Sequence, residues 1–335
     1  MTSFNRNVFS RRGFLGGAAA SLALPAAAGL LPTGRAHAAA PLLGTQVPAW
    51  YRFKIGDYEA TVVSDGPIIL GSPQDQFPSA DPAVVADLVK GDFLPADNTP
   101  LEQNCLVLNT GDKLVLIDTG MGSDQMFGPY SGRLMKSLAA AGFKGEQFDA
   151  VVLTHAHCDH CWGIMDDDGN RNFPNAQVYI SQADFDFWTD EAKLGANDFV
   201  KDFVAGARRN LLPNQDRLIY VKDGDEILPG IQAIASPGHT VGHTSYLITS
   251  NGETALFVGD VVHHYKLLFE NPGWEFAFDS DPAQAAQTRL RVFDMASKDE
   301  LPLIGYHFPF PGIGYIAPQG NAYRYVPRPM DFTFG

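Results

Sequence analysis

The stretch VVLTHAHCDHCWG, at positions 151–163, concentrates side chains that bind metals or carry out acid–base chemistry. His155, His157, Asp159 and His160 lie in it, at the end of a run typical of a β-strand. Two histidines separated by one residue project to the same side of an extended segment, so His155 and His157 could hold one ion. Asp159 and His160 are adjacent and follow an expected bend, which would direct both side chains to a second position.

The same stretch contains two of the three cysteines of the chain. Cys158 and Cys161 form a C-x-x-C pattern around the possible ligands, and Cys105 lies elsewhere. Three cysteines in 335 residues do not make a disulfide framework. A redox pair, a disulfide and additional metal ligands all stay open for Cys158 and Cys161, but we favour two small buried thiols.

Further candidate ligands occur singly, at His239 in SPGHTVGH, Asp260 in LFVGDVV and His307 in IGYHFPFPG. Each follows a strand pattern, and loops that follow strands can converge at one edge of a fold. Imidazoles and carboxylates without thiolates suit zinc, manganese, cobalt or iron in a hydrolytic site, whereas a structural zinc site favours cysteines. The pattern therefore predicts a catalytic metal site.

The elements that would position these residues alternate between runs of strands and helices. Two runs of strands, each followed by helix, predict an α/β (α+β) fold of two packed sheets with helices outside. No internal boundary is visible after the leader, so we expect one domain over 39–335. Strand patterns cover 58–66, 104–110, 113–120, 148–155, 176–181, 217–221, 231–236, 244–249, 254–260 and 301–307. Helical patterns cover 131–143, with Ser131 as the expected N-cap, 182–188, 197–209 and 281–296, which Asp281 and Pro282 open.

The motifs HAHCDH, DTG, PGHTVGH and GD and a late histidine occur in the order found in the metallo-β-lactamase superfamily, which the chain resembles over nearly all of its length after the leader. The resemblance implies an αββα sandwich of two mixed sheets. It also implies a dinuclear site in which Asp260 bridges two metals, one bound by His155, His157 and His239 and the other by Asp159, His160 and His307. Asp118 and His243 would orient the ligands without binding metal.

Within the superfamily, the chain resembles methyl parathion hydrolase and its relatives through WYRFKIGDYEATVVSDG, FGP, DFW, HFPFPGIGYI and YRYVP. This resemblance implies a homodimer. His263 and His264 follow Asp260 where these relatives tend to be apolar. One of them, for which we select His263, could reach the pocket and contact the leaving group; otherwise both are surface residues. Candidates for an aromatic substrate pocket are Phe127, Trp188, Phe199, Phe203 and Phe308.

Two divalent ions, for which we favour zinc, would share a bridging water and lower its pKa, so hydroxide would be the nucleophile. Asp159 could hold or shuttle the proton. We therefore expect a hydrolase of neutral lactones or aryl esters, with organophosphate triester hydrolysis as the main alternative. A β-lactamase and an exported metal-binding protein without turnover are the remaining interpretations.

The net charge of the chain limits the kinds of molecule that it can bind. The chain has a net charge of −14, but residues 1–38 contain four arginines and no acid, so the remaining 20 basic and 38 acidic residues give −18. This balance disfavours binding to nucleic acid or an anionic membrane.

Residues 1–38 resemble a twin-arginine signal, because they contain the paired Arg11 and Arg12, a mildly apolar run and the AHA site at 36–38. We expect a periplasmic or secreted protein without a membrane anchor after cleavage.

Overall fold

The computed structural model describes residues 40, 42–196 and 198–333. Residues 47–335 form one compact unit. The expected signal segment lies outside the described residues. In the described part of the chain, no helix combines the length and the hydropathy needed to cross a bilayer.

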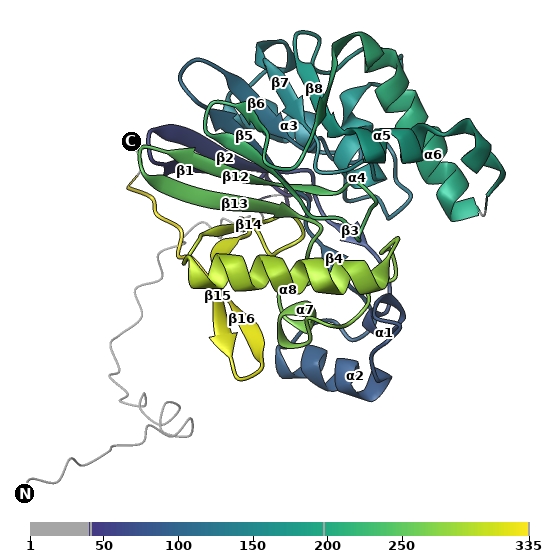
Figure 1. Ribbon diagram of the computed structural model, residues 1–335, viewed down its shortest axis with the longest axis vertical. Helices are drawn as coiled ribbons and strands as arrows, with labels where there is room; N and C mark the ends of the chain where they lie inside the picture. Colours follow the sequence, from purple (N-terminus) through teal and green to yellow (C-terminus); the bar gives the residue numbers. More distant parts are fainter. Residues whose placement is uncertain (1–39, 41, 197, 334–335) are drawn as a thin grey trace, which may run out of the picture. The chain divides into compact units, whose positions relative to one another are not determined.

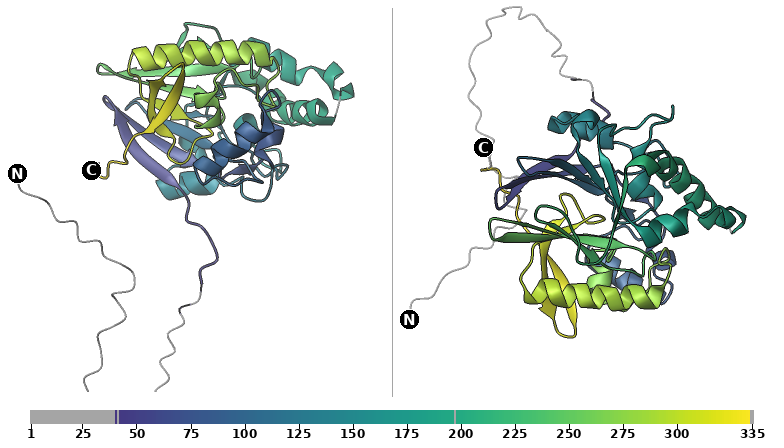
Figure 2. Two further views of the ribbon diagram at one scale, coloured as in Figure 1. Left: turned by 90° about the horizontal axis from the view of Figure 1, so that it is seen from below. Right: turned by 45° about the horizontal axis from the view of Figure 1, so that its top comes forward.

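Two seven-stranded sheets form the centre of this unit, and Figure 2 shows them as two layers. The first sheet has the spatial order β1 (Trp50–Ile55), β2 (Tyr58–Ser64), β5 (Asn104–Asn109), β6 (Leu114–Ile117), β7 (Ala150–Val152), β8 (Gln177–Ser181) and β9 (Leu218–Val221). Its pairs are antiparallel from β1 to β6 and parallel from β6 to β9. It is therefore a mixed sheet, as expected.

The second sheet has the order β10 (Glu226–Leu228), β11 (Ile231–Ala235), β12 (Thr244–Ser250), β13 (Glu253–Gly259), β14 (Leu303–Gly305), β15 (Ile313–Gln319) and β16 (Ala322–Pro327). Only β13 and β14 pair in parallel, because α8 (Pro282–Lys298) connects them. A small sheet of β3 (Ile68–Ile69) and β4 (Pro100–Leu101) lies apart from both. The strands β1, β3, β4 and β10 and the hairpin of β15 and β16 were not predicted from the sequence.

Helices cover the outer faces of the sheets, as Figures 1 and 2 show for α8 on the second sheet. The buried residues of α8 recur at helical spacing, and Asp281 caps its start by accepting the N–H of Gln284 (3.0 Å), as the sequence predicted. The other helices are α1 (Pro73–Gln76), α2 (Pro82–Gly91), α3 (Leu134–Ala141), α4 (Cys158–Cys161), α5 (Gln182–Thr189), α6 (Asp198–Leu211) and α7 (Leu267–Glu270). Short 3₁₀ turns are η1 (Gly145–Gln147), η2 (Trp162–Ile164), η3 (Glu191–Gly195) and η4 (Leu212–Arg217).

The start of α3 differs from the prediction, because Ser131 is not its N-cap. The buried carboxylate of Asp65 takes this role from the end of β2. Its oxygens accept the N–H groups of Leu134 (2.7 Å), Gly132 (3.0 Å) and Met121 (3.0 Å). A side chain distant in sequence thus satisfies donors at the start of the helix.

Candidate metal centre

The candidate ligands follow strand ends of both sheets. The segment with His155, His157, Asp159 and His160 follows β7, while Asp260 follows β13 directly. His239 lies between β11 and β12, and His307 lies two residues after β14. Asp159 and His160 lie within the single helical turn α4 rather than after a simple bend.

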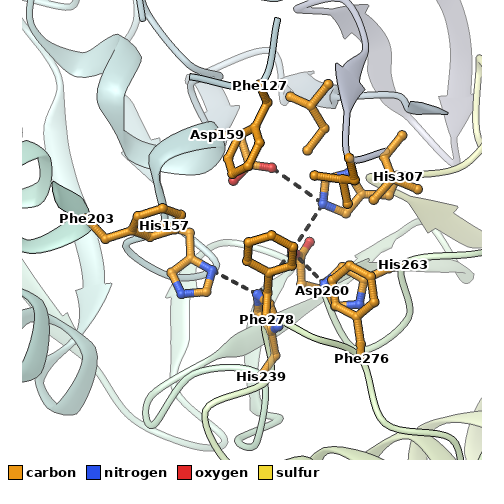
Figure 3. Close-up of a pocket in the computed structure, with 13 residues that line it drawn as sticks. Phe127, His157, Asp159, Phe203, His239, Asp260, His263, Phe276, Phe278 and His307 are labelled. Carbon is orange, nitrogen blue, oxygen red and sulfur yellow. Dashed lines mark hydrogen bonds and ion pairs between the residues drawn. The ribbon is translucent and has the colours of Figure 1, made fainter. Parts of the chain in front are cut away.

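The structure brings all seven predicted ligands together, and Figure 3 shows five of them around one cavity. Within each group below, the possible ligand atoms lie within 4.8 Å of one another. Among the described residues, three such groups contain only predicted ligands, and they are His155, His157 and His239; His155, His160 and Asp260; and Asp159, His160 and His307. Two further groups add other residues, and they are His239, His263 and Asp279; and Asp260, His263 and His307. This arrangement matches the two predicted metal positions with Asp260 between them.

Hydrogen bonds donated by Nδ1 hold the imidazoles of His160 and His155 on the side away from the cavity. Nδ1 of His160 donates to Oδ2 of Asp118 (2.8 Å). The same carboxylate accepts the N–H (2.8 Å) and the hydroxyl (2.9 Å) of Thr154, and the Thr154 hydroxyl oxygen lies 3.0 Å from Nδ1 of His155. This chain of bonds leaves Nε2 of both histidines available for a ligand.

His239 and His307, which occur singly in the sequence, are held in the same way. Nδ1 of His307 donates to the carbonyl of Glu102 (2.8 Å), and Nδ1 of His239 donates to Oδ1 of Asp279 (3.0 Å). The buried guanidinium of Arg289 lies 3.7 Å from the other oxygen of Asp279. Sequence analysis missed Asp279 and Arg289, because they lie in a loop and a helix without any motif spacing to the ligands.

Unpartnered buried atoms test whether these residues fit metal ions. Nε2 of His155, Nε2 of His160 and Oδ1 of Asp260 are buried and have no hydrogen-bond partner. Nδ1 of His157 faces Nε2 of His239 at 2.9 Å, although both nitrogens cannot keep their lone pairs so close without a shared proton or ion. Orphaned polar atoms of this kind are costly, and two divalent ions would satisfy them.

Asp260 is the electrostatic centre of the cluster. Its Oδ2 lies 3.1 Å from Nε2 of His307 and 3.3 Å from Nε2 of His239, while its Oδ1 lies 3.3 Å from Nε2 of His160. Burial would raise the pKa of Asp260, but the imidazoles of His160, His307 and His263 hold it well below its usual range. Burial and the neighbouring His160 lower the pKa of His155, which keeps that imidazole in the neutral form that binds metal.

Two further side chains tie the ligand loops together. The buried carboxylate of Asp184 in α5 accepts the N–H of Ala156 (2.7 Å) and that of Gly242 (2.9 Å), so it joins the loop of His155 to the loop of His239. His243 accepts the N–H of Asp260 on Nε2 (2.9 Å). His243 therefore positions the proposed bridging residue without facing the cavity itself.

An aromatic and aliphatic pocket opens above the cluster (Figure 3). Phe127 and Phe203 line it, as the sequence predicted, and His263 does so as well. Its remaining walls are Ile68, Leu70, Leu101, Phe276 and Phe278, together with the candidate ligands His157, Asp159, His239, Asp260 and His307. None of the described residues that line it is a lysine or an arginine. The alternation of Phe276 and Phe278 in WEFAFDS is the one sequence signal that could have indicated this wall.

Three predicted pocket residues lie elsewhere. Trp188 is buried behind the site with its ring edge-on to His157, at 4.7 Å between ring centroids, so it supports a ligand. Phe199 is 38 % exposed and packs on the outer side of Phe203. Phe308 is fully buried against Phe269 and Tyr325, because the chain turns into the core after His307.

The cysteines are free and buried, as we favoured from the sequence. The thiol of Cys161 donates to the carbonyl of Ala156 (3.4 Å), and burial raises the pKa values of Cys158 and Cys161 well above their usual range. Protonated thiols of this kind are poor metal ligands and poor nucleophiles. The C-x-x-C pattern therefore belongs to the packing around α4.

Comparison with known proteins decides the family. The model of the metallo-β-lactamase superfamily matches residues 98–307. The chain belongs to this superfamily. Its αββα fold and its hydrolase class agree with the sequence prediction.

Relatives within the superfamily are known. A protein of Bacillus sp. described as an N-acyl homoserine lactonase is 26 % identical over 228 residues, which are 63 % of this chain and 83 % of the relative. The solved structure of AidC, a dizinc quorum-quenching lactonase in complex with a product, has a TM-score of 0.80 and 26 % identity over 85 % of this chain and 99 % of AidC. The hydrolase AbOPH has a TM-score of 0.80 and 33 % identity over 86 % of this chain and 100 % of AbOPH. This member of the superfamily is thus a metal-dependent hydrolase.

Proposed function

We propose that the protein hydrolyses neutral lactones, and aryl esters of similar shape, at a dinuclear metal centre. The observation that carries this proposal is the cluster of seven candidate ligands, five of which line an aromatic pocket. The neutral, apolar walls favour uncharged substrates. The description of two relatives as lactonases supports the choice of lactones among them.

The ligand set assigned to one ion is His155, His157 and His239, and the set assigned to the other is Asp159, His160 and His307, with Asp260 shared. Two bound divalent ions would lower the pKa of water and polarise the scissile carbonyl. We favour zinc, since imidazole and carboxylate ligands suit it.

Asp159 is the residue that we assign to proton transfer. Its Oδ2 lies 3.5 Å from Nε2 of His307, at the wall of the pocket. When the oxygen of water bonds to the carbonyl carbon, Asp159 accepts the released proton. When the bond between that carbon and the ring oxygen breaks, Asp159 returns the proton to the leaving oxygen. The ring opens to a hydroxy acid, and the carboxylate is then regenerated.

Apart from the proposed metal ions, the described lining residues offer an anionic substrate no cationic side chain. The carboxylate of a β-lactam or the charge of a phosphodiester would meet no cationic side chain among the described lining residues. The net charge of −18 after the leader, obtained from 20 basic and 38 acidic residues, also repels anions. Phosphotriesters are neutral and aryl-substituted like the proposed substrates, so an organophosphate triesterase is the second candidate.

One substrate panel tests the proposal under a single metal condition. It compares dihydrocoumarin, an N-acyl homoserine lactone, p-nitrophenyl acetate, paraoxon, nitrocefin and bis-p-nitrophenyl phosphate. We expect the two lactones to have the highest kcat/KM and Asp260→Ala to abolish their turnover. Paraoxon with the highest kcat/KM would favour the triesterase, while nitrocefin or the phosphodiester would contradict the substrate class. No turnover by metal-loaded protein would favour a metal-binding protein.

A further inference from the structure

The short helix α4, which carries Asp159 and His160, depends on hydrogen bonds from outside. A helix of four residues is not stable by itself, and the carbonyls at its end need other partners. The carbonyl of His160 accepts the N–H (2.7 Å) and the hydroxyl (2.9 Å) of Thr119. The carbonyl of Asp159 would bond to the N–H of Gly163 in a longer helix, but that N–H donates to the carbonyl of Gly120 (3.1 Å).

Tyr306 supplies the partner of the Asp159 carbonyl. It follows β14 directly, it is fully buried, and its hydroxyl donates to this carbonyl. Because the hydroxyl has one proton, the thiol of Cys105, at 3.7 Å from the phenol oxygen, donates to Tyr306 in turn. A side chain that follows a strand of the second sheet thus holds a helix that follows β7 of the first sheet.

Tyr306 contacts all three residues assigned to one of the two ions, which we call the second ion. Besides its bond to Asp159, its ring packs on the imidazole of His160, at 4.1 Å between centroids, and lies edge-on to His307 at 5.0 Å. Asp159 and His307 come from α4 and from the segment after β14, and their side chains face each other in Figure 3. Tyr306 therefore fixes the separation of the two segments that would hold the second ion.

The segments that carry the ligands of the first ion are joined by another residue. His155 and His157 lie in one segment and His239 in the other, and the carboxylate of Asp184 accepts a backbone N–H from each segment. Each of the two metal positions thus has its own buried side chain that links its two ligand segments.

The backbone of Tyr306 is held independently of its hydroxyl. Its carbonyl accepts the N–H of Asn104 in β5 (2.9 Å). The side-chain amide of Asn104 donates to the carbonyls of Gly305 (3.1 Å) and Phe308 (2.8 Å). The segment around His307 would therefore keep its place without the hydroxyl. The Asp159 carbonyl would lose its partner, and α4 would move to satisfy it.

We infer that Tyr306 is a positioning residue that holds Asp159 and His160 at the distance from His307 that the second ion requires. The inference rests on the dinuclear centre of the proposed function. Tyr306 acts through the candidate ligands and binds neither metal nor substrate itself. Its hydroxyl should therefore control the affinity of the second ion, while the first ion keeps the link through Asp184.

The test variant is Tyr306→Phe, which keeps the ring on His160 and removes only the hydroxyl. Tyr246→Phe is the matched control, since Tyr246 is also fully buried and its hydroxyl donates to the carbonyl of Leu153 (2.8 Å), just after β7. Both variants lose a buried bond between a hydroxyl and a carbonyl, but only the bond of Tyr306 reaches α4. Circular dichroism of the metal-free proteins shows whether each variant folds.

Calorimetric titration of metal-free protein with zinc measures the affinities of the two ions. His307→Ala and His239→Ala are reference variants, because the binding step that each removes identifies the second or the first ion. Electron paramagnetic resonance of protein titrated with manganese gives an independent readout, since a coupled pair of ions and a single ion have different spectra.

We expect Tyr306→Phe to weaken the step that His307→Ala removes by at least tenfold and to leave the other step close to native. At limiting manganese its spectrum should be that of a single ion. Tyr246→Phe should keep both affinities. Replacement of Tyr306 by p-aminophenylalanine, whose amine can donate to the same carbonyl, should restore the affinity for the second ion.

Three results would overturn the role of Tyr306. They are native affinity for the second ion in Tyr306→Phe, an equal loss from both binding steps, and a Tyr306→Phe protein that does not fold with or without metal while Tyr246→Phe folds. The last result would mean that the hydroxyl serves the whole fold. A single binding step in the native protein would instead overturn the dinuclear centre of the proposed function.

Discussion

The carboxylate of Asp118 holds the imidazole of His160, with 2.8 Å between Oδ2 and Nδ1. Asp118 follows β6 directly and has a positive φ of 61°, a conformation that few non-glycine residues adopt. The bonds to His160 and Thr154 compensate for this conformation. Asp118, at the end of β6, thus fixes the position of the candidate ligand His160 relative to the first sheet.

Replacing Asp118 by Asn should weaken metal binding. An Asn has one acceptor oxygen, so it cannot serve both Thr154 and His160, and its amide would meet a donor. We expect a loss of about 10- to 100-fold in affinity for at least one ion, which a metal titration measures. Asp112→Asn, in an exposed turn just before β6, is the control. Native affinity for both ions in Asp118→Asn would show that Asp118 does not orient His160.

Metal content tests the assigned bridging role of Asp260. We expect elemental analysis of the purified protein to give about two divalent ions per chain, because the ligand groups on either side of Asp260 define two positions. Asp260→Ala should bind at most one ion tightly and should be inactive. A native stoichiometry near one after loading with excess zinc or manganese would contradict the dinuclear assignment.

Arg289 is a buried cation that stabilises the loops around the site. Its guanidinium donates to the carbonyls of Val261 (2.9 Å), Pro272 (2.8 Å) and Trp274 (2.9 Å). Arg289→Met would remove this donor from three carbonyls and the neighbouring cation from the carboxylate of Asp279, so we expect a loss of about 3 kcal/mol in the free energy of unfolding. Urea denaturation measures it.

The control for this substitution is Arg291→Met on the exposed side of the same helix. Its effect should be small, because the side chain is in contact with water. Equal losses in the free energy of unfolding in the two variants would show that the burial of Arg289 does not increase its contribution to stability.

The clustering of the candidate ligands could be predicted from the sequence because their motifs are local. His155, His157, Asp159 and His160 lie within six positions, and the strand patterns before His239, Asp260 and His307 place them at loop starts. The residues that hold the candidate ligands and the helix start in place could not be predicted in this way. Asp279 and Arg289 meet His239 only through tertiary packing, and Asp65 replaces Ser131 as the cap of α3 because the fold brings it there.

The residues that line the pocket were also predicted only in part from the sequence. Phe127 and Phe203 were predicted, whereas Ile68 and Leu70 come from a short edge segment without a motif. Phe308 was one of the aromatic candidates for the pocket, and it follows the candidate ligand His307 in sequence. The direction of a side chain after a strand depends on the turn, and the turn after His307 directs Phe308 into the core.

Export through the twin-arginine route remains a prediction. Changing Arg11 and Arg12 to Lys should keep the protein in the cytoplasm, since that route requires the paired arginines. Fractionation of cells followed by immunoblotting measures the distribution. The matched control is Arg6→Lys, which lies outside the pair and should be exported. Normal export of the double variant would show that another route is used.

His264 should make the stability of the fold depend on pH. Its Nδ1 accepts the N–H groups of Lys266 (3.1 Å) and Leu267 (3.2 Å) at the start of α7, so the ring is neutral. Burial lowers the pKa of His264 from 6.5 to about 4. The unfolded chain therefore binds a proton between pH 6.5 and about 4 that the folded chain does not bind. The stabilisation is complete above pH 6.5 and decreases as the pH falls through this window.

His264→Asn isolates this contribution, because the Asn oxygen can accept the same backbone N–H groups but does not titrate. We expect the native protein to lose about 2 kcal/mol more than His264→Asn in the free energy of unfolding between pH 7 and pH 5. Urea denaturation of metal-free protein at the two pH values measures the difference, since the other buried histidines titrate alike in both proteins. Equal losses for the native protein and the variant would mean that His264 does not stay neutral in the fold.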